Sequence, residues 1–110
     1  MGFATIGSVV LIKFPYSNFK SYKLRPALVV GLAEMGDLIV CQITSNAAIS
    51  KLAVGISDSD FKSGRLPAKS FIRPDKLFTI SGSLVATKIG VVGPKVSDSV
   101  KVRLGKILGI

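Results

Sequence analysis

Six polar and charged residues stand where apolar segments of this sequence give way to polar ones. They are Arg25, Thr44, Ser45, Arg73, Asp75 and Lys76. An arginine guanidinium can bind two phosphate oxygens at once and stays charged. Hydroxyl groups can donate to charge that develops during a displacement, and a carboxylate can accept the proton of an attacking hydroxyl. These residue types together predict chemistry on a phosphate group.

The sequence lacks the residues that most alternative chemistries need. It contains no histidine, so the usual general base and the commonest metal ligand are both missing. The single cysteine, Cys41, excludes an internal disulfide and follows the apolar run 38–40, where we expect a buried, inert thiol. No glycine-rich phosphate motif leads into a helix. We therefore expect neither a metal nor a cofactor.

RNA supplies its own nucleophile, the 2′-hydroxyl. A protein that aligns this group with the phosphorus and stabilises the added charge can cleave RNA without metal or histidine. The products are a 2′,3′-cyclic phosphate and a 5′-hydroxyl. The composition agrees with a polyanionic partner, since 15 Lys and Arg residues against 6 Asp and Glu give a net charge of +9. Each candidate taken alone also fits an ordinary surface or turn role, and a basic domain without any nucleic-acid partner stays open.

Length and composition favour one domain over residues 1–110. Hydrophobic residues form 48% of the chain, which argues against disorder. No apolar run approaches the ~20 residues that cross a bilayer, and the N-terminus does not resemble a signal peptide. We expect a cytoplasmic protein without a membrane partner.

The hydrophobic pattern predicts a mostly β chain. Expected strands cover residues 7–14, 27–32, 38–44, 52–56, 70–72, 77–80 and 84–92, with Pro26 at the start of the second. Turns are expected at 35–37 and 81–82, and loops at 16–23, 46–50, 58–69 and 73–76. The first loop carries four polar or basic residues near its tip, Ser17, Asn18, Lys20 and Lys23.

The last segment changes to helical spacing. Apolar residues recur on one face at Val96, Val100, Leu104, Ile107 and Leu108, with Ser97 as the expected N-cap. This helix is expected to cover the core. The elements together predict a strongly curved, antiparallel barrel-like sheet closed by one terminal helix.

Several segments resemble, in the same order, motifs of the MazF/PemK toxin family. Residues 25–30 resemble its RPALV motif, residues 41–45 its ITS strand end, and residues 70–80 the second half of PemK-type members. Residues 7–10 with 14–15, 66–67 and 88–90 extend the match over nearly the whole chain. Two departures stand out. Ser8 replaces the usual acidic residue, and the loop 17–23 is short and lacks the Gly-Glu pattern that commonly precedes RP.

The resemblance implies a small SH3-like antiparallel barrel of the CcdB/PemK type with a C-terminal α-helix. It implies a homodimeric toxin of a type II toxin–antitoxin system that cleaves single-stranded RNA selectively, without metal. The family's catalytic arginine and threonine match Arg25 and Thr44, and the PemK-type arginine and aspartate match Arg73 and Asp75. We expect RNA to contact Lys20, Lys23, Ser45 and Lys76, and an acidic antitoxin to block the groove.

Two other functions stay open. One is a non-catalytic, protein-binding toxin on the same barrel, like the CcdB-type gyrase poisons, which lack the RP and ITS residues. The other is a plain binder of single-stranded nucleic acid, which would need exposed aromatic side chains. Phe19 and Tyr22, in the first loop, are the candidates for that role.

Overall fold

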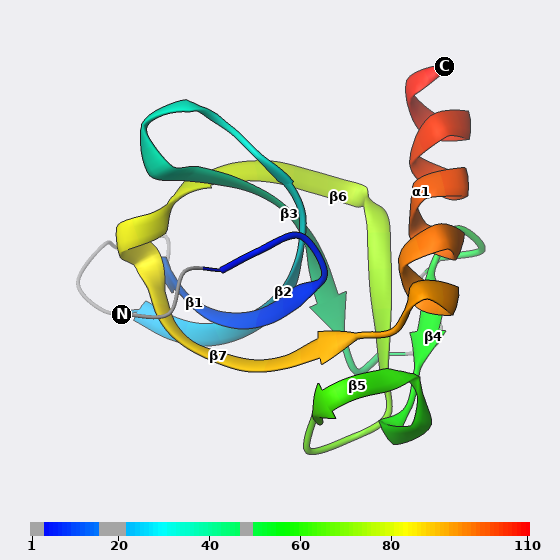
Figure 1. Cartoon of the computed structure of the whole chain (residues 1–110), viewed down its shortest axis with the longest axis horizontal. Coiled ribbons are helices and arrows are strands. Elements are labelled where there is room, and N and C mark those ends of the chain that lie inside the picture. The colour runs from blue at the N-terminus through cyan, green and yellow to red at the C-terminus, as the bar shows by residue number, and fades with distance from the viewer. Residues whose placement is uncertain (1–3, 16–21, 47–49) are drawn as a thin grey trace.

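The strands of the chain form one curled antiparallel sheet with the spatial order β4–β6–β3–β2–β1–β7–β5 (Figure 1). This computed structural model describes residues 4–15, 22–46 and 50–110. The bounds of the elements are β1 Ser8–Pro15, β2 Tyr22–Leu32, β3 Asp37–Thr44, β4 Val54–Ile56, β5 Phe61–Gly64, β6 Ser70–Ser81, β7 Val85–Val92 and α1 Pro94–Leu108. The prediction of a mostly β, curved antiparallel barrel with one C-terminal helix is confirmed.

The sheet buries apolar side chains on both of its faces, in two clusters. The first core lies under α1 and consists of Val9, Leu28, Cys41, Ile43, Val54, Ile56, Leu66, Ile72, Val92, Val96 and Val100. The second core lies inside the curl and consists of Val10, Ile12, Ala27, Val29, Leu38, Val40 and Ile80. Successive residues of a strand point to opposite faces, which explains why a nearly continuous apolar run such as 38–41 serves both cores.

Helix α1 covers the first core as predicted, but it begins earlier than predicted. Its N-cap is Gly93 and its first residue is Pro94, so the assignment of Ser97 as N-cap was wrong. Proline suits the first helical position because its missing N–H would have no helical partner there. Val96 and Val100 are buried, whereas Ile107 and Leu108 are exposed. The last turn of the helix therefore extends beyond the core it covers.

Strand β2 also begins earlier than the pattern predicted. Strand β1 pairs with β2 as far as Pro15 and Tyr22, so the strand begins four residues before the predicted start at Pro26 and includes residues 22–23, which were predicted as loop. The ladder between β2 and β3 starts only after Pro26, at Ala27 and Gln42. The proline thus lies at the end of that ladder, where its missing N–H is tolerated.

The predicted loop 58–69 contains a 3-10 turn at Asp58–Asp60 and the short strand β5. The backbone N–H of Ser57 donates to an Asp60 carboxylate oxygen at 2.8 Å, which fixes the turn. Strand β5 then pairs with β7. At Gly64 the backbone has a φ of 74°, and a Cβ atom there would collide with the Ile89 carbonyl oxygen. A short strand with this close approach and no apolar alternation carries no periodic signal.

The two short strands predicted at 70–72 and 77–80 are one strand, β6. In the register with β3, Cys41 pairs with Leu77 and its neighbour Gln42 pairs with Arg73. Residues 74–76 therefore form an insertion opposite β3. The proline and charged residues of this insertion were mistaken for a connection between strands, but they bend a continuous strand.

The remaining elements follow their predictions closely. The turns expected at 35–37 and 81–82 are 3-10 turns at Glu34–Gly36 and Gly82–Leu84. The predicted strand 52–56 is shorter than expected, since β4 covers Val54–Ile56. In the described part of the chain, no helix has the length and apolar character needed to cross a membrane.

Candidate active site

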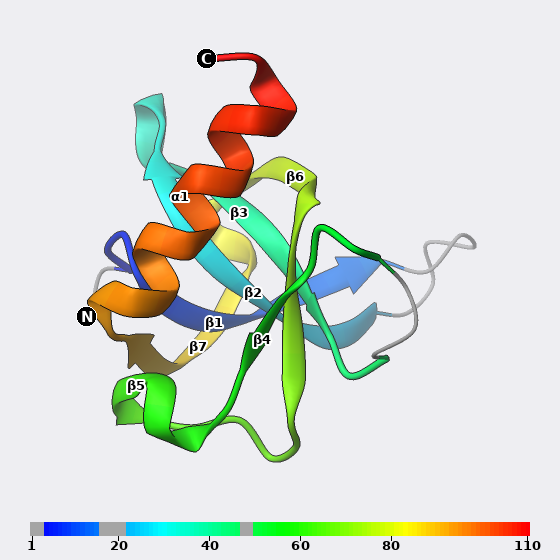
Figure 2. The ribbon, with the colours of Figure 1, turned by 90° about the vertical axis from the view of Figure 1, so that its right-hand side faces the viewer.

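Three strand ends gather on one side of the barrel, to the right in Figure 2. They are the end of β1, the start of β2 and the end of β3 (Figure 2). The sheet order places β6 beside β3 in the same layer. Residues at these ends come from distant parts of the sequence, and hydrogen-bonded strand pairing brings them together.

Arg25 and Thr44 lie on neighbouring strands and on the same face of the sheet. The last pair between β2 and β3 is Ala27 with Gln42, and paired residues share a face. Two residues further along their strands, Arg25 and Thr44 return to that same face. Arg25 also pairs with Ile12, a residue of the second core. Both candidates therefore lie on the face that carries the second core.

Strand β6 adds Arg73 and Phe71 to this face. Arg73 pairs with Gln42 and Phe71 pairs with Thr44, while Ile72 between them points into the first core. We call the polar end of this sheet face the site face, and it consists of Lys23, Arg25, Gln42, Thr44, Phe71 and Arg73.

The insertion in β6 carries an ion pair with two contacts. The Arg73 guanidinium donates from Nε to Oδ1 of Asp75 at 3.3 Å and from Nη2 to Oδ2 at 2.7 Å. Pro74 between them is buried, which anchors the insertion to the core. The Arg73 and Asp75 side chains are 14% and 26% exposed. Because the pair fixes the guanidinium fork, Arg73 is held in one orientation at the edge of the site face.

The hydrogen bond from the Arg73 guanidinium lowers the pKa of the Asp75 carboxyl below its ordinary value of 3.8. Burial raises this pKa, but the hydrogen bond, supported by the charges of Arg73 and Lys76, outweighs it. Asp75 is thus ionised at neutral pH and is a weak proton acceptor. The stability that the pair contributes is present above the unfolded pKa and is lost as the pH falls through the lower folded pKa.

The Thr44 hydroxyl is oriented by the backbone that follows it. The N–H of Asn46 donates to Thr44 Oγ1 at 3.2 Å. Since the oxygen accepts this bond, the hydroxyl hydrogen can donate to a ligand. Ser45 lies just beyond the strand and is exposed. The doublet therefore provides one oriented hydroxyl and one at the surface.

The basic residues predicted to bind RNA lie in different parts of the structure. Lys23 was expected in a loop, but it lies in β2 opposite Phe14, and it is exposed on the site face. Lys76 is exposed in the β6 insertion beside Asp75. Lys20 and Phe19 lie outside the described residues. Tyr22 lies in β2, and only its place in the strand is described.

Two residues singled out by the sequence are buried structural groups. Burial, with a smaller effect of the nearby Asp75 charge, raises the pKa of the Cys41 thiol to about 12. Ser8 is fully buried, and its hydroxyl oxygen accepts a hydrogen bond from the Thr5 N–H at 3.1 Å. A serine thus closes this turn without a carboxylate. No cluster of three or more potential metal-ligating His, Cys, Asp or Glu side chains occurs in the described ranges.

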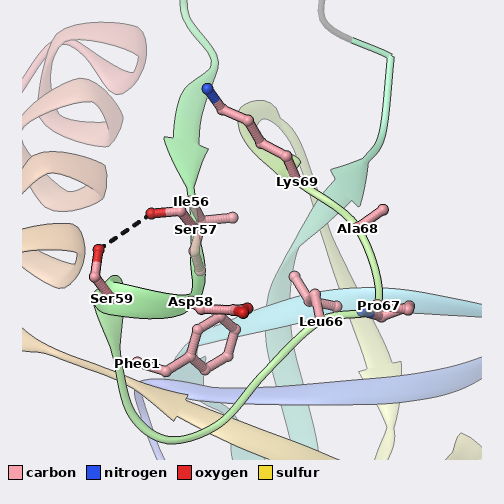
Figure 3. A pocket seen from close by; sticks show the side chains of 9 residues that line it. All are labelled: Ile56, Ser57, Asp58, Ser59, Phe61, Leu66, Pro67, Ala68 and Lys69. Atoms are coloured by element: carbon pink, nitrogen blue, oxygen red, sulfur yellow. Dashed lines mark hydrogen bonds between the residues drawn. The ribbon is translucent and has the colours of Figure 1, made fainter.

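A hollow of about 470 Å³ lies between β4, the 3-10 turn and the segment before β6 (Figure 3). Its polar groups are poorly placed for a phosphate. The hydroxyls of Ser57 and Ser59 are 3.3 Å apart and bond to each other, and Asp58 brings a negative charge. The Lys69 ammonium points away from Asp58 (Figure 3). We therefore take the site face as the candidate active site.

The charge distribution supports that choice. Apart from Asp75, the acidic residues are Glu34, Asp37, Asp58, Asp60 and Asp98. Asp37 lies at the start of β3, the opposite end from Thr44, and the others lie on elements outside the site face. The Asp75 charge is matched by Arg73. Among the described residues, no carboxylate forms a salt bridge with Lys23 or Arg25, so the site face keeps an excess of positive charge. The fold and this face define a small basic β-barrel with an arginine-rich site at its strand ends.

A family model for the PemK-like, MazF-like toxins of type II toxin–antitoxin systems matches residues 5–108. The chain belongs to this family. The resemblance drawn from its motifs is thereby confirmed. No sequence of a curated protein matches the chain.

Solved structures share the fold over the full chain. MazE–MazF from Deinococcus radiodurans has a TM-score of 0.81 at 21% identity, covering 100% of this chain and 99% of that one. MazF alone from the same organism has a TM-score of 0.77 at 22% identity, covering 100% of both chains. An endoribonuclease from a mycobacterial species, in complex with its cognate antitoxin, gives 0.76 at 18% identity, covering 100% and 97%. At these identities the likeness establishes the fold alone.

Sequence reasoning missed two members of the site face, Gln42 and Phe71. A signal for the first was present, because Gln42 and Thr44 are polar residues two apart in an apolar strand. That spacing places both on one face. Phe71 stands two residues before Arg73, but only the register with Thr44 shows that it borders the site.

Proposed function

We propose that this toxin is a metal-independent endoribonuclease that cleaves single-stranded RNA, mRNA included, at selected sequences. The observation that carries the proposal is the site face, where Arg25 and Arg73 flank the strand that presents the oriented Thr44 hydroxyl. A phosphodiester placed there meets the positive charges of two guanidinium groups and a neutral donor. The mycobacterial structural relative described as an endoribonuclease supports endoribonuclease activity.

The reaction uses the nucleophile of the substrate. The 2′-oxygen of the RNA attacks the adjacent phosphorus, and the bond from phosphorus to the 5′-oxygen breaks. The 2′-proton passes to water, and the departing 5′-oxygen takes a proton from water. Arg25, Arg73 and Thr44 stabilise the negative charge that grows on the phosphate oxygens, and each such donor is typically worth ~10²–10³ in rate.

The first test is cleavage in the absence of metal. Purified protein incubated with end-labelled single-stranded RNA in EDTA is expected to cut it and leave 2′,3′-cyclic phosphate and 5′-hydroxyl ends. Mass spectrometry of the fragments identifies both ends. Activity that disappears in EDTA and returns with magnesium would contradict the mechanism. Binding of RNA without cleavage would instead indicate a nucleic-acid-binding module. The absence of both binding and cleavage would indicate a protein-binding toxin.

A second prediction concerns the role of Asp75. Its carboxylate is engaged by Arg73 through both oxygens, and its pKa is lowered. We propose that it mainly orients Arg73. Loss of a general base typically lowers kcat by ~10²–10⁴-fold. Asp75→Asn should then lower kcat by less than the lower end of that range.

The pH dependence distinguishes the two roles of Asp75. If Asp75 only orients Arg73, the pH profiles of kcat/KM for wild type and Asp75→Asn should have the same shape at every pH above the low pKa of Asp75. As the general base, its loss would remove the acidic limb of that profile along with most of the activity. Measuring wild type and Asp75→Asn from about pH 5 to 8 covers the range in which a Glu- or Asp-based limb with a raised pKa would appear.

The antitoxin is the proposed protein partner. The excess of positive charge suits an acidic, extended segment that competes with RNA for the site face. Replacing Lys20 and Lys23 with alanine should weaken RNA and antitoxin binding together. It should also reduce the slope of log affinity against log salt for RNA by about 0.7 for each phosphate that the variant no longer neutralises. Titrations at several salt concentrations measure both effects. An inhibitor that binds tightly while RNA stays bound would refute a shared groove.

We further propose that the toxin forms a homodimer. Exposed apolar side chains of Leu32 and Met35, 57% and 97% exposed, border a hollow of about 1060 Å³ at the end of the barrel opposite Arg25 and Thr44. Such an apolar surface suits a two-fold contact between copies of the chain. A contact there would leave the site face open to RNA.

A further inference from the structure

Gln42 occupies the centre of the site face and has no part in the proposed reaction. It lies on β3, between the strand of Arg25 and the strand of Arg73, and pairs with Ala27 on one side and Arg73 on the other. The residue is half-buried. Within the described residues its amide makes no side-chain hydrogen bond, yet none of its polar atoms is sealed from solvent. The amide is available to a ligand.

The chemistry of this amide differs from that of its neighbours. Lys23, Arg25 and Arg73 are cations that only donate, which matches phosphate oxygens. A glutamine amide offers a donor and an acceptor side by side and has no net charge. That pattern matches the N7 acceptor and N6 amino group of adenine, a pairing that glutamine makes with both atoms at once. Gln42 is therefore better suited to a base edge than to the backbone.

The spacing along β3 would place the Gln42 amide close to a phosphate bound at Thr44. Gln42 and Thr44 are two residues apart on one face, a separation of roughly 7 Å at ~3.3–3.4 Å per residue. A phosphate held at Thr44 and Arg25 is thus one step away from the amide. Strand β3 lies inside the sheet between β2 and β6, so this distance is fixed by the fold.

We propose that Gln42 is a specificity-determining residue that recognises an adenine next to the cleaved bond. The inference rests on the proposed ribonuclease function. The arginines and Thr44 hold the backbone and carry the chemistry, and Gln42 selects where along the RNA the chemistry occurs. Phosphate contacts by themselves carry no sequence information.

The test maps the cut sites of a random single-stranded RNA pool with wild-type protein, Gln42→Ala and Gln42→Glu. Wild type is expected to prefer adenine at one fixed position beside the cut. Gln42→Ala should reduce that preference by on the order of 10–100-fold, the value of one base contact of this type, and leave preferences at other positions intact. Gln42→Glu should move the preference toward cytosine, whose amino group donates to a carboxylate. Thr79→Ala, an exposed change on β6 away from the site face, is the control and should match wild type.

A change in the RNA provides a second measurement. Replacing the selected adenine by 7-deazaadenine removes the N7 acceptor, which should slow wild type but not Gln42→Ala. Unchanged base preference in the Gln42 variants, or an equal loss at every sequence, would overturn the inference while leaving the ribonuclease intact. If wild-type protein cuts no RNA, the proposed function fails, and the inference fails with it. Thermal melting of each variant identifies any loss of folding.

Discussion

The substitutions Arg25→Ala and Arg73→Ala should each lower kcat for RNA cleavage by about 10²–10³-fold. The physical reason is that each guanidinium stabilises charge that appears on the phosphate only as the 2′-oxygen attacks. Arg25 is exposed on β2, and the Arg73 side chain is 14% exposed in an ion pair that solvent also reaches. Exposed charges contribute little to folding, usually within about ±0.5 kcal/mol, so the loss in Arg25→Ala should fall on rate. Arg73→Ala also breaks the ion pair with Asp75 and should lower the melting temperature as well as the rate.

Three controls make this result interpretable. Arg65→Ala removes an exposed arginine outside the site face and should cut RNA at the wild-type rate. Arg25→Lys keeps the charge but loses the planar fork that binds two oxygens, and should recover only part of the activity. Melting temperatures confirm that each variant is folded. If Arg25→Ala and Arg73→Ala both cut as fast as Arg65→Ala, the site is elsewhere on the molecule.

The sequence was sufficient to predict the architecture because the strands that build the two cores carry strong apolar patterns. Residues 38–41 illustrate this, since a run that is apolar on both faces specifies a strand buried on both faces. Strand β5 escaped prediction for the opposite reason. It has little apolar content and is held by backbone pairing to β7 and by the close approach of Gly64 to Ile89.

The geometry of the site could be predicted only in part. Motif resemblance selected Arg25, Thr44, Arg73 and Asp75, but it could not show that Arg73 and Asp75 belong to one continuous strand. The insertion at residues 74–76 brings the two side chains into direct contact across a buried proline. Register with β3 then sets Arg73 beside Gln42. Long-range pairing of this kind depends on strand order, which local spacing does not encode.

Asp75 shows how the structure changes an expectation about chemistry. A carboxylate in a site without histidine was a natural candidate for the general base. An effective general base has a pKa near the working pH, whereas the Arg73 hydrogen bond lowers the pKa of Asp75 below 3.8. The same contact that makes it a weaker base makes it a firm anchor for the guanidinium. We therefore propose that catalysis in this site relies on oriented donors rather than on a general base.

Thr44 offers the sharpest test of that conclusion, because its hydroxyl can be removed without changing the shape of the side chain. Thr44→Val keeps the branched volume and the strand propensity but deletes the donor, and should reduce kcat by about 10²–10³-fold. Thr44→Ser keeps a hydroxyl that the Asn46 N–H can still orient, and should retain most of the activity. The effect should appear in kcat more than in KM, since the bond strengthens only as charge develops.

Removal of the hydroxyl also deletes the hydrogen bond from the Asn46 N–H to Thr44, and this effect must be separated from the catalytic one. That N–H is exposed and can bond to water, so Thr44→Val should melt within a few degrees of wild type. Single-turnover cleavage of a short RNA isolates the chemical step from product release. If Thr44→Val cleaves as fast as Thr44→Ser in that assay, the hydroxyl does not stabilise the transition state, and the two arginines alone carry the charge.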